Sequence, residues 1–160
     1  MTSIMKEAMK KAGMKLPNDS NPKAQPERLQ EQVEEKTEDL QDYTAKAEKV
    51  ILDLKNNRYY EKFTTSKLRN ILSMVSEIYN DVLSDYSETL SPKIQDRILH
   101  MKVRLVYECG REPIIKEFYK LAELEKIING IGDSRKRFNY FAKYMEALVA
   151  YHSFYGGSNE

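Results

Sequence analysis

The sequence predicts an all-α fold, an antiparallel bundle of about five helices with a flexible N-terminal tail. Apolar residues recur at helical spacing through most of the chain, and no stretch shows the alternation of a strand. Only six glycines and five prolines interrupt the 160 residues, and they separate runs long enough to form helices. Charged residues make up 32% of the chain and hydrophobic residues 41%, a mixture typical of a soluble helical protein.

Prolines mark the boundary of the predicted domain. Three of them fall in LPNDSNPKAQPE, and they break any helix there. We therefore predict a flexible basic segment over residues 1–26, a single helical bundle domain over 27–157 and a short tail over 158–160. Because residues 1–16 place apolar side chains at helical spacing opposite lysines, docking of this segment on a partner or a membrane surface is an alternative to disorder.

The first two helices of the bundle are expected on either side of a short break. A run without Gly or Pro extends from about Glu27 to Asn57, with an apolar stripe along it. The next helix begins at FTTS, where Thr64, Thr65 or Ser66 can serve as the N-cap.

The last three helices have clearer start signals. In SETLSPKIQ, Ser91 is placed as an N-cap and Pro92 at the first helical position, and this helix is expected to run to the glycine of ECGR. Another helix is expected over roughly 113–129, ending at NGIG. Asp133 or Ser134 caps the last one, which ends at the glycine pair of FYGG.

Charge is unevenly distributed along the chain, although the net charge is only +1. It is +3 over residues 1–26, −3 over 27–62, −2 over 63–90, +2 over 91–112 and +1 over 113–160. A net charge this small gives no whole-molecule footprint for nucleic acid. Any interface with RNA or DNA must therefore rest on local clusters of cations.

No catalytic residue, metal site or cofactor is predicted. The chain lacks Gly-rich phosphate loops, HExxH and CxxC motifs, and it has only two histidines. His152 falls on an apolar helix face and is predicted to pack in the core, as is Cys109. A single cysteine excludes an internal disulfide and favours a cytoplasmic, reducing compartment. No apolar run approaches the roughly 20 residues that cross a bilayer.

A basic stripe runs along the helix expected at 91–110. At 100° per residue, Arg97, Arg104 and Arg111 share one side of this helix, next to the side that carries its apolar residues. Lys102 lies off the stripe. Such a stripe suits phosphates, although local ion pairs through Glu108, which is close to two of these arginines, explain it equally well.

The start of the helix after FTTS is a second candidate anion site. Helix N-termini present free N–H groups and the positive end of the dipole. Lys67 and Arg69 add two cations beside three hydroxyls. An ordinary N-cap with basic neighbours is the alternative.

Three blocks carry a resemblance to a known family. FTTSKLRNILSMV, MKVRLVYECGRE and FAKYMEALVAYHSFYGG, in this order and spacing, resemble the small subunit of type III-A CRISPR effector complexes, the Csm family. The resemblance covers roughly residues 60–157. It implies a non-catalytic, all-helical subunit, present in more than one copy, that helps to hold the guide RNA and its target RNA in antiviral defence. It also implies partners: a repeated backbone subunit, a large subunit and further copies of itself.

The resemblance and the stripe together give the candidate site. Pairing between guide and target reads sequence, so the protein is expected to contact backbone and duplex shape. Our hypothesis assigns RNA contacts to six cations: Lys67, Arg69, Arg97, Lys102, Arg104 and Arg111. Packing or subunit contacts are assigned to four residues of the last block: Tyr144, Glu146, Tyr151 and Gly156. The main alternative is a helical scaffold or protein-interaction module that does not bind nucleic acid.

Overall fold

The all-α prediction is confirmed. The computed structural model describes residues 43–157, and these form helices joined by short connections, with no strand among them. The predictions for residues 1–26, for the tail 158–160 and for the start of the domain at 27–42 lie outside the described residues. The helices span residues 43–55, then η1 (Tyr60–Lys62), α3 (Thr65–Ser84), α4 (Pro92–Arg111), α5 (Pro113–Leu121), α6 (Leu124–Asn129) and α7 (Arg135–Phe154).

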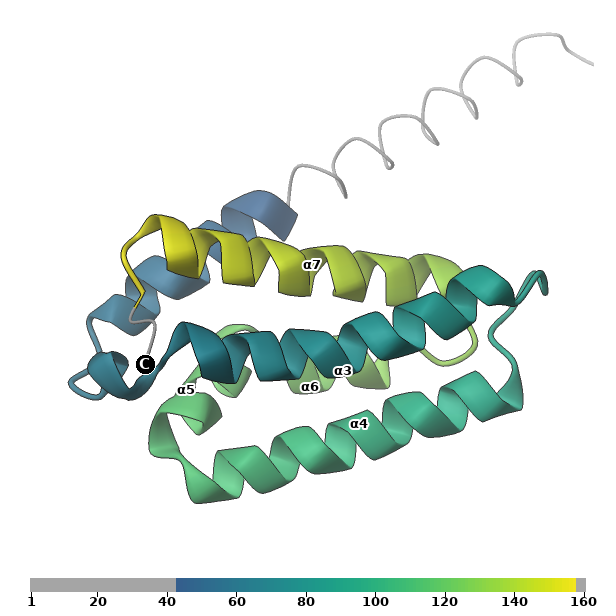
Figure 1. Cartoon of the computed structure of the whole chain (residues 1–160), viewed down its shortest axis with the longest axis horizontal. Helices are drawn as coiled ribbons and strands as arrows, with labels where there is room; N and C mark the ends of the chain where they lie inside the picture. The colour runs from purple at the N-terminus through teal and green to yellow at the C-terminus, as the bar shows by residue number, and fades with distance from the viewer. Residues whose placement is uncertain (1–42, 158–160) are drawn as a thin grey trace, which may run out of the picture. The chain divides into compact units, whose positions relative to one another are not determined.

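Three long helices of 20 residues each form the body of the bundle (Figure 1). α3 lies at its centre, with α7 antiparallel along one side and α4 antiparallel along the other. The short helices α5 and α6 pack on α4 and lead the chain back to the start of α7. One face of α4 therefore meets the bundle, while its opposite face meets solvent.

The starts of the three long helices are fixed by hydroxyl caps. Thr64, Ser91 and Ser134 are the N-caps of α3, α4 and α7, and each side chain accepts a hydrogen bond from the backbone amide three residues later. Each bond satisfies a donor that has no partner within the helix. These caps were among those predicted, and Ser134 rather than Asp133 serves α7.

The prediction of a single helix over 113–129 is wrong. The chain leaves α5 after Leu121, and Glu123 takes a left-handed conformation at φ 51° before α6 begins. This break turns both Ala122 and Leu124 into the core, and the hydroxyl of Tyr144 donates to the Ala122 carbonyl at 3.2 Å. Glutamate rarely adopts this conformation, so the local sequence gave no sign of the break.

The core is built from the apolar stripes that the helical periodicity predicted. α3 contributes Leu68, Ile71, Val75, Ile78 and Val82. α4 contributes Ile94, Ile98, Met101, Leu105 and Cys109, which confirms the predicted burial of the cysteine. Large aromatic side chains from α5 and α7 fill the centre: Phe118, Phe138, Phe141 and Tyr144.

Arg135 fixes the turn between α3 and α4. Its guanidinium donates to the carbonyls of Val82 at 2.7 Å and Ser87 at 2.8 Å, and also to that of Asp85. These carbonyls lie at and just beyond the end of α3, where the regular intrahelical donors run out. The Val82 carbonyl also accepts from the Asp85 amide at 3.3 Å. The turn is therefore held to the start of α7.

Replacing Arg135 with alanine is expected to lower the free energy of unfolding by about 1.5–3 kcal/mol, because hydrogen bonds to a charged donor are lost. Arg137 is the matched control. It lies in the same first turn of α7, but its guanidinium donates to one carbonyl, that of Gly130 at 2.9 Å. Chemical denaturation of the two alanine variants measures the difference. Equal losses would show that the turn is held in another way.

Candidate nucleic-acid interface

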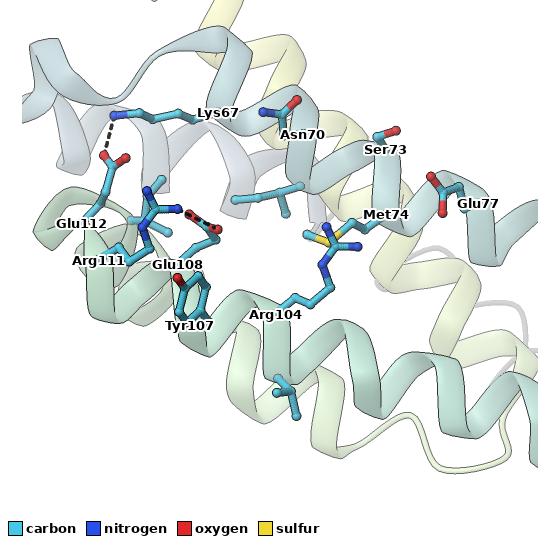
Figure 2. A pocket seen from close by; sticks show the side chains of 13 residues that line it. Lys67, Asn70, Ser73, Met74, Glu77, Arg104, Tyr107, Glu108, Arg111 and Glu112 are labelled. Atoms are coloured by element: carbon cyan, nitrogen blue, oxygen red, sulfur yellow. Dashed lines mark hydrogen bonds and ion pairs between the residues drawn. The ribbon is translucent and has the colours of Figure 1, made fainter.

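A groove of about 760 Å³ lies between α3 and α4 (Figure 2). Its α3 wall carries Lys67, Asn70, Met74 and Glu77, which recur at helical spacing on one face. Its α4 wall carries two arginines of the predicted stripe, with an aromatic and an acidic side chain beside them: Arg104, Arg111, Tyr107 and Glu108. The polar residues that follow Lys67 on α3 were not predicted, although their helical spacing from Lys67 places them on the same face.

Arg104 is the unpaired cation of this groove. It is exposed, and its guanidinium points from α4 across the groove toward α3, close to Met74 (Figure 2). It has no hydrogen bond or ion pair within residues 43–157 of the structure. An unpaired guanidinium can donate hydrogen bonds to a phosphate without first losing a protein partner.

Arg97 and Arg111 have acidic partners. Arg97 forms an ion pair with Asp81 of α3, and Glu77 lies 3.8 Å from its guanidinium. Arg111 lies 3.6 Å from Glu108, one of the pairs that the sequence suggested. Two of the three stripe arginines are therefore balanced locally, one of them by acids of a neighbouring helix.

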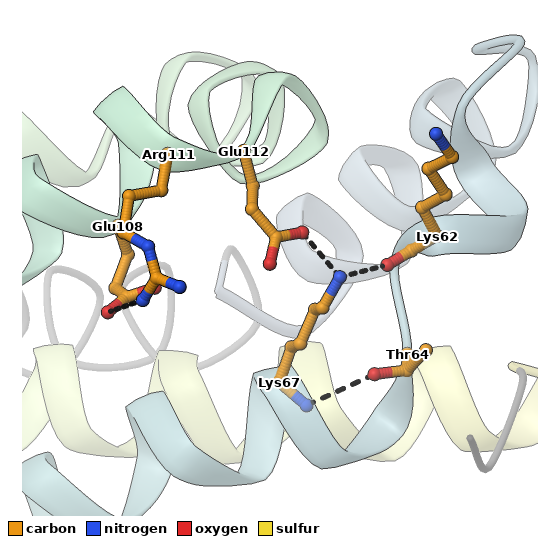
Figure 3. Close-up of polar contacts among 6 residues, drawn as sticks. All are labelled: Lys62, Thr64, Lys67, Glu108, Arg111 and Glu112. Atoms are coloured by element: carbon orange, nitrogen blue, oxygen red, sulfur yellow. Dashed lines mark hydrogen bonds and ion pairs between the residues drawn. The ribbon is translucent and has the colours of Figure 1, made fainter.

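At the start of α3, the Lys67 side chain already has a carboxylate partner within the protein (Figure 3). The Lys67 ammonium forms an ion pair with Glu112 and donates to the Lys62 carbonyl at 2.9 Å. The backbone amide of Lys67 donates to the hydroxyl oxygen of the N-cap Thr64 at 3.3 Å. Arg69 is exposed and does not line the groove. The structure therefore separates the two cations that the sequence grouped.

Lys102 lies away from the groove, as its position off the stripe indicated. Its ammonium donates to the Asn129 side chain at 2.7 Å and lies 3.9 Å from Glu125. Both partners belong to α6, so Lys102 joins α4 to that helix.

The groove has no excess of positive charge. Its lining includes three cations, Lys67, Arg104 and Arg111, and three acids, Glu77, Glu108 and Glu112. Exposed ion pairs contribute only about 0–1 kcal/mol, so a phosphate can displace a carboxylate at small cost. The groove can thus bind a polyanion. Arg104 can bind a phosphate directly, whereas Lys67 and Arg111 must first release their acidic partners.

The last block of the resemblance is divided between core and surface. Tyr144 is fully buried, whereas Glu146 is exposed. Tyr151 is half-buried and stacks on Tyr155, with ring centroids 6.4 Å apart. Gly156 adopts φ 77°, a left-handed conformation that glycine takes without steric cost, and it ends α7.

His152 is buried, which confirms the prediction, and it lies in an aromatic cage. Its Nδ1 is 3.0 Å from the Tyr60 hydroxyl, and the ring of Phe63 meets it edge-on at 5.0 Å. Its Nε2 is buried and has no hydrogen-bond partner in the described part of the chain. Gly157 lies directly against this nitrogen. Sequence reasoning found the histidine but not these neighbours, which come from distant positions.

Burial lowers the pKa of His152 below its usual value of 6.5. The unfolded chain therefore binds a proton more readily than the folded chain. The neutral His152 ring makes its full contribution to the free energy of unfolding above about pH 6.5. This contribution is lost as the pH falls through the pKa of His152 in the folded chain, by at most about 1.4 kcal/mol per pH unit. Chemical denaturation at a series of pH values from about 7.5 to about 5, a range that spans the usual pKa of histidine, measures this loss. His152→Gln should flatten the profile, and the exposed His100→Gln should not.

Residues 43–157 contain neither a metal site nor a membrane span. Among residues 43–157, no set of three or more His, Cys, Asp or Glu side chains is placed to hold a metal ion. No helix in the same range combines the length and apolar character that crossing a bilayer demands.

Comparison with known proteins identifies the family. A family model described as Csm2 Type III-A matches residues 34–158. The chain belongs to this family. The resemblance read from the three sequence blocks is thereby confirmed, and it extends further toward the N-terminus than those blocks do.

Several relatives of the Csm2 family, each named CRISPR system Cms protein Csm2, are similar over most of the chain. The protein of Mycobacterium tuberculosis is 35% identical over 112 residues, which cover 70% of this chain and 90% of the relative. That of Enterococcus italicus is 37% identical over 98 residues, 60% of this chain and 70% of the relative. That of Streptococcus thermophilus is 34% identical over 120 residues, 74% and 95% of the two chains.

Proposed function

We propose that this chain is a non-catalytic small subunit of a type III-A CRISPR RNA-guided effector complex that acts in antiviral defence. Its membership of the Csm2 family carries this proposal. Several copies would lie in a row along the guide RNA–target RNA duplex. Their neighbours would be a repeated backbone subunit and a large subunit, in the cytoplasm.

The α3–α4 groove is the part of the chain that we assign to the duplex. Arg104 would contact a phosphate first, because it has no partner to give up. Arg111 and Lys67 would follow by exchanging carboxylates for phosphates. Arg69, Arg97 and Lys102 lie outside the groove lining, so any RNA contact of theirs belongs to a neighbouring surface. For Arg97 this is a small hollow next to the groove, which it lines together with Arg104.

One observation favours a second candidate, a helical scaffold that contacts only proteins. The groove holds as many acids as cations, which is unusual for a surface that binds nucleic acid. The two candidates differ in their salt dependence. Each phosphate contact lowers the logarithm of the affinity by about 0.7–0.9 per tenfold rise in salt, whereas a protein-only scaffold shows negligible duplex binding at any salt concentration.

Affinity purification of the tagged full-length chain from its native cells tests the proposed function. We expect copurifying short RNAs that share a constant 5′ segment followed by variable spacers, together with a repeated backbone subunit. Copurification of other proteins without such RNA would contradict the proposal and favour the scaffold.

A further inference from the structure

The α4 wall of the α3–α4 groove presents an aromatic ring to solvent. Tyr107 lines the groove and is 63% exposed. It follows Arg104 by three residues and precedes Arg111 by four, and this spacing places the three side chains on one side of the helix. The Arg111 guanidinium lies 5.7 Å from the centre of the ring. An exposed ring with a cation on either side along the helix is suited to stacking on an unpaired base.

Apolar side chains also line the groove. Ile71 of α3 and Ile115 of α5 line it from the core, where both are buried, and Val103, one turn before the tyrosine, is exposed. Asn70 and Ser73 add an amide and a hydroxyl from α3. Apolar and aromatic side chains with a few polar groups are typical of sites for small organic ligands. The groove can therefore bind a flat ring as well as a phosphate.

The size of the groove suits one nucleotide and excludes a duplex. Its volume, about 760 Å³, falls within the range of about 300–1,000 Å³ found for pockets that hold one small ligand. An RNA duplex is much wider than a groove between two neighbouring helices of a bundle, so paired strands must stay outside it. An unpaired nucleotide can leave the base stack and enter, because no partner base holds it.

The charge balance of the groove favours the same ligand. A surface that follows the phosphates of a strand carries an excess of cations, but three cations and three acids line this groove. One nucleotide brings one or two phosphates, and the unpaired guanidinium of Arg104 can bind one of them. Its base is bound by stacking, which needs no net positive charge. An apolar segment of a protein would leave this guanidinium without a partner, so a nucleotide fits the lining better.

We propose that the groove binds one unpaired nucleotide of the RNA, with its base stacked on Tyr107 and its phosphate bound by Arg104. This inference rests on the proposed function, in which the groove meets the guide RNA–target RNA duplex, and it names the part of the RNA that enters. Tyr107 thereby distinguishes unpaired from paired nucleotides, because a base inside a duplex has no free face to present to the ring.

Binding of two synthetic RNA duplexes to the purified full-length chain tests this assignment. The duplexes differ only in one extra, unpaired adenosine, and fluorescence anisotropy measures both affinities at low salt. We expect the duplex with the unpaired adenosine to bind about tenfold more tightly, as stacking of one base allows. Tyr107→Phe should keep this preference, and Tyr107→Ala should abolish it. Tyr86→Ala is the matched control, because Tyr86 is 98% exposed and does not line the groove.

Equal affinity for the two duplexes, or a preference that survives Tyr107→Ala, would overturn the inference. Binding of neither duplex would also overturn it and would leave the groove to a protein partner. If free adenosine monophosphate competes as well as unlabelled duplex with the unpaired adenosine, the groove is a site for free nucleotides and the inference is wrong. The proposed function fails separately. If guide RNA copurifies from cells but the preference is absent, only the inference is wrong. If the preference is present but no guide RNA copurifies, only the proposed function is wrong.

Discussion

Arg104→Glu is expected to weaken binding of the guide RNA–target RNA duplex about tenfold at low salt, and to reduce the salt slope by about one phosphate contact. The variant removes the unpaired guanidinium of the α3–α4 groove. It also places a carboxylate where phosphates would lie, among three acids that already line the groove. Duplex affinity of the assembled complex over a series of salt concentrations measures both quantities.

Lys143→Glu is the matched control for this experiment. Lys143 is exposed on α7 and does not line the groove, so the same change of charge should leave the salt slope unaltered. Arg104 is exposed and unpaired, so its replacement should also leave the fold intact. If Arg104→Glu unfolds the chain, or if both variants weaken binding equally, the groove is not the phosphate-binding surface.

Gly157→Ala is expected to lower the free energy of unfolding by about 1–3 kcal/mol, as overpacking of a filled interior does. The added Cβ would lie 2.3 Å from Nε2 of His152. That ring cannot retreat, because Tyr60 binds its other nitrogen and Phe63 lies against it. Moving the chain end instead would break the 2.9 Å hydrogen bond from the Gly157 amide to the His152 carbonyl.

Gly110→Ala provides the comparison, since the same atom there enters open space. This variant should raise the free energy of unfolding of the isolated chain by about 0.5–1 kcal/mol, through better helix propensity. Chemical denaturation of both variants decides the matter. An unchanged denaturation midpoint for Gly157→Ala would show that Gly157 does not pack tightly against the His152 ring.

The features that the sequence predicted well are local. The caps Ser91 and Ser134 bind amides three residues away, so a short window contains all of their chemistry. The burial of His152 also follows from the apolar periodicity of its own helix. The break at Glu123 escaped prediction because no glycine, proline or asparagine marks it, and tertiary packing around Ala122 overrides the local preference.

The features that the sequence could not predict involve partners far apart along the chain. The acids that balance Arg97 come from α3, and the carboxylate beside Lys67 comes from Glu112, 45 residues later. Tyr60 and His152 are 92 residues apart. A helical wheel shows which cations share a side of one helix, but not which acids the next helix places opposite them. The charge balance of the groove therefore became visible only in the fold.

Crosslinking of RNA to this chain in the purified complex tests the central claim most directly. After ultraviolet irradiation, the modified peptides are identified by mass spectrometry. We predict that they come from the two walls of the groove, residues 67–77 of α3 and 103–111 of α4. Tyr107 is a favourable site because it is exposed and lines the groove together with Arg104. RNA attached only to the basic start of α7, at Arg135–Arg137, or no attached RNA, would contradict the account.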